Sequence, residues 1–174
     1  MTRKAKINFL ITSAFIAALY AGLTFLSNAF GLAYGPIQLR ISEVLTVLPA
    51  VTPAAIPGLT VGCFIANIGS FNAADMIFGT FATFIAAALT YCCKGIKIKK
   101  IPVLSILSPV IINAVIIGFE IAVLFLEGGY SFWGFLISAL EVGAGELVVC
   151  FGLGIPFYLA AEKYRIFDMK FTKR

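Results

Sequence analysis

Long apolar stretches with few polar residues between them dominate this chain. They cover approximately residues 7–27, 38–56, 58–71, 75–93, 101–126 and 132–161. An α-helix needs about 20 mostly apolar residues to cross the hydrocarbon core of a membrane. The alternation of period two that a membrane β-barrel requires does not recur. The pattern therefore predicts an all-α integral membrane protein, a bundle of six transmembrane helices that forms a single domain over residues 1–174.

The uncharged region 44–71 decides how many spans are expected. Prolines interrupt it, and proline breaks a membrane helix or kinks it. Loops on the cytoplasmic side of a membrane carry an excess of Lys and Arg. One span here would put the lysines after residue 93 and the basic tail outside the cell, whereas two spans, 38–56 and 58–71, put every basic cluster in the cytoplasm. We therefore expect six spans with both termini cytoplasmic.

Composition agrees with a membrane protein and excludes several function classes. Hydrophobic residues make up 61% of the chain and charged residues 12%, whereas soluble domains are roughly 45 to 50% apolar. Histidine is absent, which removes the commonest metal ligand and general base. The four cysteines form no C-x-x-C pair, and the net charge of +5 lies mostly in the flanks of the spans, so neither a metal site nor nucleic-acid binding is expected. We do not expect an enzyme.

Polar residues gather in the outer half of the expected bundle. Arg40 and Glu43 lie three residues apart at the start of the second span, and Asn113 and Glu120 share nearly one helix face. A carboxylate at the bilayer centre costs roughly 2.5 to 3.5 kcal/mol even on insertion scales, so such residues are usually functional. We expect a cup that opens to the outside and binds a solute. Its expected lining is Arg40, Glu43, Asn67, Asn113, Glu120 and Glu146.

Three further residues are weaker candidates for this cup. Asp75 follows a short turn, where its carboxylate could instead cap the next helix. Glu141 and Glu146 are about 140° apart on a helix, so at most one of them points straight into the cup. Trp133 could stack on a ring or simply belong to the aromatic belt at the membrane interface. The loop 27–36 is a candidate lid.

The chemistry of the cup favours one kind of ligand. Apart from Arg40 it offers acids and acceptors, which suit a solute rich in N–H donors or carrying positive charge. The alternative for Arg40 and Glu43 is a simple ion pair at a helix start. A separate feature is the small-residue stripe Ala14, Ala18 and Gly22, which allows a close helix approach either inside the bundle or from another membrane protein.

Several stretches of the chain together resemble the QueT family. They are Q-L-R-I-S-E-V-L-T-V-L-P (38–49), I-P-G-L-T-V-G-C-F-I-A-N (56–67), D-M-I-F-G-T-F-A-T (75–83), the asparagine and glutamate of N-A-V-I-I-G-F-E (113–120), and G-E (145–146). The resemblance covers about residues 7 to 160. Members of this family are substrate-binding S components of energy-coupling factor (ECF) transporters.

The resemblance implies a function for the whole chain. A multi-pass S component in the bacterial cell membrane captures a queuosine precursor, such as 7-aminomethyl-7-deazaguanine, from outside. It docks on a transmembrane T component and two ATP-binding-cassette ATPases, which use the ATP, so this chain needs no cofactor of its own. The stripe Ala14, Ala18 and Gly22 is then the expected docking face. No Walker motif occurs in the chain, as expected if the partners hydrolyse the ATP.

Two other hypotheses remain open at this point. The chain could be a stand-alone, proton-coupled secondary carrier of a cationic or vitamin-like solute, in which Glu120 or Glu146 relays protons. It could also be a membrane scaffold without a ligand. Solute uptake without the ATPases would favour the carrier, and saturable binding of a deazaguanine would exclude the scaffold.

Overall fold

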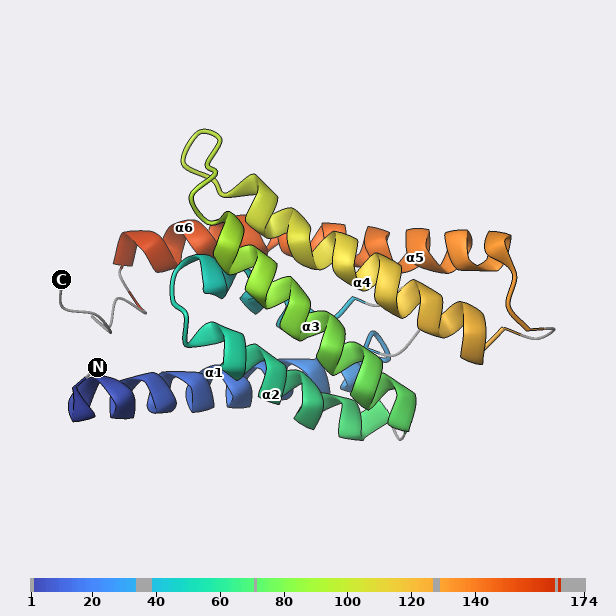
Figure 1. The fold of residues 1–174 in the computed structure, drawn as a ribbon, viewed down its shortest axis with the longest axis horizontal. Coiled ribbons are helices and arrows are strands. Elements are labelled where there is room, and N and C mark those ends of the chain that lie inside the picture. Colours follow the sequence, from blue (N-terminus) through green and yellow to red (C-terminus); the bar gives the residue numbers. More distant parts are fainter. Residues whose placement is uncertain (1, 34–38, 71, 127–128, 165, 167–174) are drawn as a thin grey trace.

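The protein is built from helices, as its sequence predicts. The computed structural model describes residues 2–33, 39–70, 72–126, 129–164 and 166. The elements are α1 (Arg3–Ala29), η1 (Ile41–Ala50), α2 (Ala55–Asn67), η2 (Ile68–Ser70), α3 (Ala73–Cys93), α4 (Val103–Leu124), α5 (Phe132–Gly152) and α6 (Gly154–Tyr164) (Figure 1). Within the described residues, four helical stretches are long and apolar enough to cross a membrane: α1, α3, α4, and α5 together with α6.

The stretch predicted as a span over 38–56 differs from a regular transmembrane helix. It contains η1, a 3₁₀-helix of ten residues, which at about 2 Å per residue is roughly 20 Å long, shorter than the roughly 30 Å hydrocarbon core. Pro49 has no N–H to donate to a carbonyl one turn back. Thr46 Oγ1 donates to the Glu43 carbonyl over 2.6 Å. Both features favour a short, tight helix over a long one.

The last predicted span, 132–161, is broken in the structure. Helix α5 ends at Gly152 and α6 begins at Gly154. Glycine weakens a helix interior, and Pro156 cannot donate a backbone hydrogen bond there. The two helices nevertheless continue in nearly the same direction (Figure 1).

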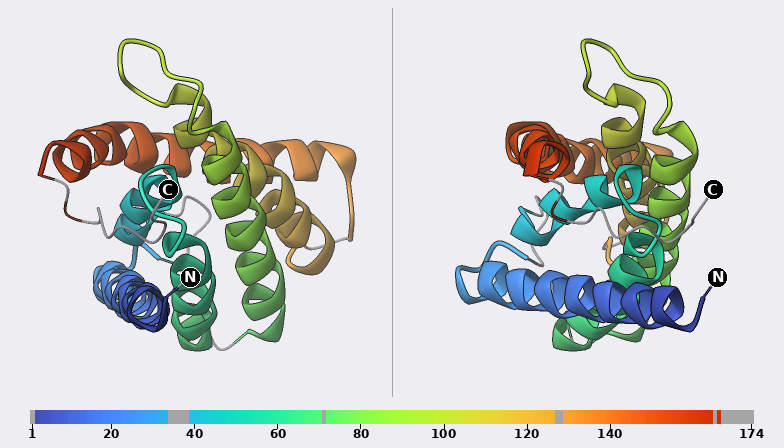
Figure 2. Two further views of the ribbon diagram at one scale, coloured as in Figure 1. Left: turned by 60° about the vertical axis from the view of Figure 1, so that its left-hand side comes forward. Right: turned by 90° about the vertical axis from the view of Figure 1, so that its left-hand side faces the viewer.

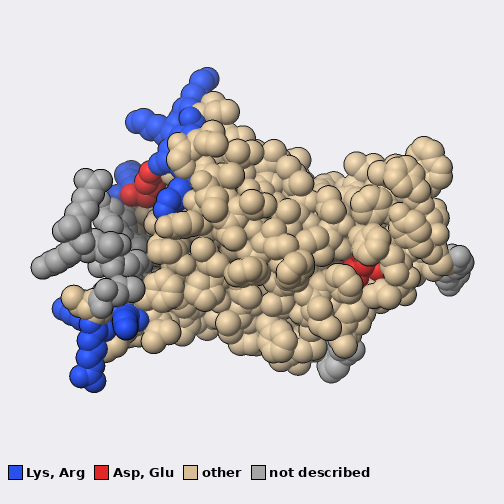
Figure 3. Space-filling view, in the orientation of Figure 1, with Lys and Arg blue, Asp and Glu red and all other residues tan. Residues whose placement is uncertain are grey.

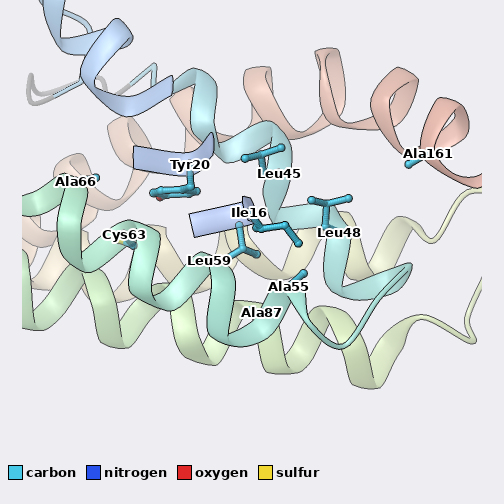
Figure 4. Packing of buried hydrophobic residues seen from close by; sticks show 10 residues of the cluster. All are labelled: Ile16, Tyr20, Leu45, Leu48, Ala55, Leu59, Cys63, Ala66, Ala87 and Ala161. Carbon is cyan, nitrogen blue, oxygen red and sulfur yellow. The ribbon is translucent and has the colours of Figure 1, made fainter. Parts of the chain in front are cut away.

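Element η1 occupies the centre of the molecule. It contacts every helix from α1 to α6, and both views of Figure 2 show it between α1 and the pair α5–α6. One core cluster, drawn in Figure 4, joins α1, η1 and α2 through residues such as Ile16, Leu48 and Leu59. A second cluster joins η1 to α4, α5 and α6 through Val47, Ile106 and Tyr158, among others. Helices on both sides therefore position η1.

Helices α1 and α2 approach each other closely because α2 carries glycine at the contact. A Cβ atom on Gly58 would lie 2.8 Å from the Ser13 carbonyl oxygen, and one on Gly62 would lie 2.8 Å from that of Ala17. Only glycine fits such a backbone approach. The glycine side of α2 therefore packs closely against α1.

Exposed basic residues gather at one end of the molecule (Figure 3). This is the end where α1 begins, where α3 connects to α4, and where α6 ends (Figure 1). Arg40 is the exception among the described basic residues, since it is buried. The arrangement is typical of a cytoplasmic face. The count of six spans and the cytoplasmic position of both termini stay predictions.

Candidate substrate site

Two charged groups enter the middle of the bundle from η1. Arg40 directly precedes this helix and is 9% exposed, and Glu43 lies in its first turn and is 3% exposed. Residues three apart eclipse each other on a 3₁₀-helix, so both side chains leave η1 in one direction. Arg40 Nε donates to the Ala33 carbonyl oxygen over 2.9 Å, and its Nη1 donates to Asn67 Oδ1 over 3.2 Å. The guanidinium is therefore held by several partners.

The Glu43 carboxylate is held by a residue that sequence analysis missed. The hydroxyl of the fully buried Tyr20, on α1, donates a short hydrogen bond to Glu43 Oε1. The other oxygen, Oε2, is buried and has no hydrogen-bond partner among the described residues. A tyrosine inside an apolar span was itself the available signal, because a buried tyrosine hydroxyl usually finds a polar partner.

Helices α4 and α5 supply a second polar pair. Asn113 Nδ2 donates to Glu146 Oε1 over 2.6 Å. The thiol of Cys150, one turn further along α5, lies 3.5 Å from Glu146 Oε2 and donates to it. Both oxygens of Glu146 thus have hydrogen-bond partners, whereas only one oxygen of Glu43 has one.

A small cavity connects these groups at the centre of the bundle. Its volume is about 10 Å³, roughly the space that the centre of one water molecule needs. The bicyclic base expected from the family resemblance is far larger, so it would fit only if the lining side chains or helices moved apart. The lining residues are Arg40, Glu43, Gly79, Thr83, Asn113, Ile117, Val142 and Glu146.

Asn67 supports the cavity without lining it. Its side chain is fully buried, accepts a hydrogen bond from Arg40, and donates to the Asp75 carbonyl oxygen over 2.9 Å. A Cβ atom on Gly79 would lie 2.5 Å from Asn67 Nδ2, so glycine at this position leaves room for the amide. Asn67 therefore connects Arg40 to α3.

Glu120 and Asp75 form a second acidic location, on the side of the cavity away from the lysine-rich end. Glu120 is 1% exposed and lies about one turn beyond the cavity-lining residue Ile117. The Asp75 carboxyl group is near enough to interact electrostatically with that of Glu120, and Glu120 Oε1 is buried without a hydrogen-bond partner in the described part of the chain. The expectation that Asp75 caps its helix is wrong, because the Asn72 side chain accepts from the Ala74 N–H over 2.9 Å.

The remaining candidates lie outside this arrangement. Glu141 is only half-buried, in line with the expectation that at most one of Glu141 and Glu146 points into the cup. Trp133 is 73% exposed, which suits the membrane interface better than a buried ring contact. Of the candidate lid, residues 34–36 lie outside the described residues.

The stripe Ala14, Ala18 and Gly22 faces away from the bundle. All three residues are exposed, and a Cβ atom added to Gly22 would meet no atom of the described residues within 4 Å. Packing inside the bundle, one of the two interpretations of this stripe, does not occur here. Its use in docking stays a prediction.

Comparison with known families gives a match over most of the chain. The family model described as QueT transporter matches residues 10–163. The chain belongs to the QueT transporter family. This confirms the resemblance carried by residues 38–49, 56–67 and 75–83. The family consists of transporters rather than enzymes, and the described helices are apolar, as expected of a multi-pass protein of the bacterial cell membrane.

A curated relative gives a closer comparison over part of the chain. The queuosine precursor transporter QueT of Lactococcus lactis subsp. cremoris (strain MG1363) is 37% identical to this chain over 87 residues. The alignment covers 50% of this chain and 52% of the relative, so the chain spans about half the length of the curated relative it matches. No solved structure matches the chain.

Proposed function

We propose that this chain is the substrate-binding subunit of an ECF-type importer and captures a 7-deazaguanine queuosine precursor from outside. The observation that carries the proposal is two buried carboxylate oxygens without a hydrogen-bond partner in the described structure: Glu43 Oε2, of a residue that lines the polar cavity, and Glu120 Oε1, beyond it. A buried acceptor without a partner costs about 1 to 3 kcal/mol. A ligand with matching N–H donors would remove that cost.

The two acidic locations suit the two ends of 7-aminomethyl-7-deazaguanine. Its heterocycle presents a ring N–H and an exocyclic amine side by side, and a carboxylate accepts such a pair well. We assign this edge to Glu43 and the ring carbonyl to Arg40. Glu146 is the weaker choice for the donor edge because Asn113 and Cys150 already engage its oxygens.

The ammonium group of the ligand is assigned to Glu120 and Asp75. Two carboxyl groups lie together there, and a cation between them would be held by charge-assisted hydrogen bonds. Both residues lie on the side of the cavity away from the lysine-rich end. If that end is cytoplasmic, as expected from the positive-inside rule, a solute from outside meets this pair first.

The partners belong to the same proposal. A transmembrane T component would dock on the exposed stripe Ala14, Ala18 and Gly22, and two ATP-binding-cassette ATPases would use ATP to drive release of the solute inward. All three residues of the stripe are exposed, and no atom of the described residues would obstruct a Cβ atom on Gly22, which supports this role.

Calorimetric titration of the full-length chain in detergent tests the ligand. We expect saturable binding of 7-aminomethyl-7-deazaguanine, and binding at least about tenfold weaker for 7-cyano-7-deazaguanine, because the nitrile lacks the ammonium that charged hydrogen bonds would hold. Mass spectrometry of the small molecule that copurifies provides an independent check. Absence of binding by every deazaguanine would overturn the proposal.

Uptake measurements distinguish the importer from the stand-alone carrier. Cells that express this chain without the T component and ATPases should accumulate no precursor above background. Accumulation driven by a proton gradient alone would contradict the proposal and favour the carrier.

A further inference from the structure

An apolar groove lies on the molecular surface between α3 and α4, near the lysine-rich end. Its volume is about 190 Å³, far larger than the cavity at the centre of the bundle. It opens toward the membrane, since Leu89 and Leu104 are each 40% exposed and Ile111 is 49% exposed. The lining residues are Leu89, Cys93, Leu104, Ser108, Ile111 and Ile112.

The wall of this groove is held in place by a reciprocal pair of hydrogen bonds. Thr90 Oγ1 donates to the Ser105 carbonyl oxygen over 3.0 Å, and Ser105 Oγ donates to the Thr90 carbonyl oxygen over 2.9 Å. Both residues are fully buried. The groove is therefore preformed, which lowers the entropic cost of binding an occupant.

The interior of the groove suits hydrocarbon rather than peptide. Its hydroxyl-bearing residue, Ser108, donates back to the Leu104 carbonyl oxygen over 2.9 Å. A peptide segment would bring backbone N–H and C=O groups into a place that offers them little compensation, at a cost of several kcal/mol for each unsatisfied group in a membrane. An acyl chain brings no such groups.

Positive charge follows the groove in the loop between α3 and α4. Lys94 directly follows the lining residue Cys93. Further along the same loop, Ile98 and Ile101 form a tight hairpin with Lys99 and Lys100 at its tip, both at positive φ (48° and 71°). Type I′ turns with this backbone favour Asn-Gly or Gly-Gly. The two lysines therefore occupy backbone positions that lysine seldom adopts.

Lys97, in the same loop, forms an ion pair with Glu162. Lys97 Nζ lies 2.7 Å from Glu162 Oε1, and this hydrogen bond with Glu162 is the main cause that raises the pKa of Lys97. The contact connects the loop to α6.

Basic pockets between transmembrane helices on the cytoplasmic side bind anionic lipid headgroups.

We propose that this groove and the lysines of the adjoining loop between α3 and α4 bind one anionic phospholipid. One acyl chain lies along the groove, and the headgroup phosphate lies at Lys94, Lys99 and Lys100. The proposal is independent of the substrate and of the importer partners.

Native mass spectrometry of the full-length chain, released from detergent with added lipid, tests the proposal. Phosphatidylglycerol and phosphatidylcholine with identical acyl chains are compared. Each lysine near an anionic headgroup raises the binding constant about fivefold, so phosphatidylglycerol should bind at least about tenfold more tightly. Equal binding of the two lipids would overturn the proposal.

Two pairs of variants separate the headgroup from the chain. The triple variant Lys94→Gln, Lys99→Gln, Lys100→Gln should lower phosphatidylglycerol binding to the phosphatidylcholine level. Its matched control is Lys4→Gln with Lys6→Gln, which removes charge from the same end of the molecule and should keep the preference. Persistence of the preference in the triple variant would contradict the headgroup assignment.

Filling the groove tests the acyl chain. Ile111→Trp should lower binding of both lipids about tenfold or more. Val115→Trp is the control, since Val115 is on the same helix, 50% exposed and outside the groove lining. Equal lipid binding by these two variants would overturn the groove as the acyl-chain site. Circular dichroism of each variant checks that the helices form.

Discussion

Helix α1 has two faces of opposite character. On the inner face, four hydroxyl side chains make hydrogen bonds to η1 or the residues just after it. Tyr20 bonds Glu43, Thr24 Oγ1 donates to Ser42 Oγ over 2.7 Å, the Ile41 N–H donates to Ser27 Oγ over 2.9 Å, and Ser13 Oγ donates to the Ala54 carbonyl oxygen over 2.9 Å. The outer face carries the small, exposed stripe Ala14, Ala18 and Gly22.

With two such faces, one helix could contact the proposed docking partner and also hold the candidate site. The inner face connects α1 to the element that carries Glu43, whereas the outer face contacts no other described helix closely at Gly22. Ala18 and Tyr20 are only two residues apart. A displacement of α1 by a docking partner would therefore be transmitted to Glu43 through direct hydrogen bonds.

The largest expected effect comes from a bulky side chain on α2 where that helix packs against α1. Gly62→Leu would put a Cβ atom 2.8 Å from the Ala17 carbonyl oxygen, and overpacking of this kind costs about 1 to 3 kcal/mol or more. The melting temperature in detergent should fall by several degrees. Gly22→Leu on the open face is the matched control and should melt like the unmodified protein. Equal melting of the two variants would show that the faces do not differ in packing.

Bulk on the outer face should block transport without harming the site. Ala14→Trp or Ala18→Trp prevents close helix approach, so uptake in cells that express the partners should fall about tenfold or more while ligand affinity stays unchanged. Uptake assays and calorimetry on the same variants measure the two effects. Normal transport by both variants would argue against this docking face.

A third change tests whether ligand affinity can be lowered without altering either face of α1. Glu120→Gln removes the negative charge assigned to the ligand ammonium, and a hydrogen bond to a charged group is worth about 1.5 to 3 kcal/mol. Affinity for 7-aminomethyl-7-deazaguanine should fall about tenfold or more, with complex formation intact. Unchanged affinity in calorimetry would remove Glu120 from the site.

The smallest effect is expected on the inner face itself. Tyr20→Phe keeps the ring but removes the hydroxyl that holds Glu43, a change worth about 1 kcal/mol. Ligand affinity should fall about fivefold. Tyr91→Phe, at the lysine-rich end, is the control and should bind normally. If the two variants have the same affinity, Tyr20 does not position Glu43 for the ligand.

The polar candidates could be predicted because charge is costly in an apolar chain. Arg40, Glu43, Asn113, Glu120 and Glu146 each interrupt an otherwise apolar stretch, and the structure buries every one of them. A membrane tolerates such groups only where the protein gives them partners. Four of them, all but Glu120, line the central cavity, as the same cost favours.

Other features could not be predicted, for reasons that are local. A tyrosine inside an apolar span indicates a polar partner, but hydropathy does not say which one, so the hydrogen bond from Tyr20 to Glu43 could not be assigned from the sequence. The 3₁₀ geometry of η1 depends on hydrogen bonds such as the one from Thr46 to the Glu43 carbonyl, which hydropathy does not report. Helix α3 begins at Ala73, two residues before the predicted span 75–93, so Asn72 rather than Asp75 caps it. Helix boundaries shift easily by one or two residues.

The central position of η1 constrains how the protein is made. Ten residues that carry a carboxylate are too short and too polar to partition into lipid on their own. The partners of η1 include α5 and α6, which the ribosome synthesises roughly a hundred residues later. Element η1 therefore reaches its final depth only when the C-terminal helices arrive, so biogenesis ends with the assembly of the segment that carries Glu43.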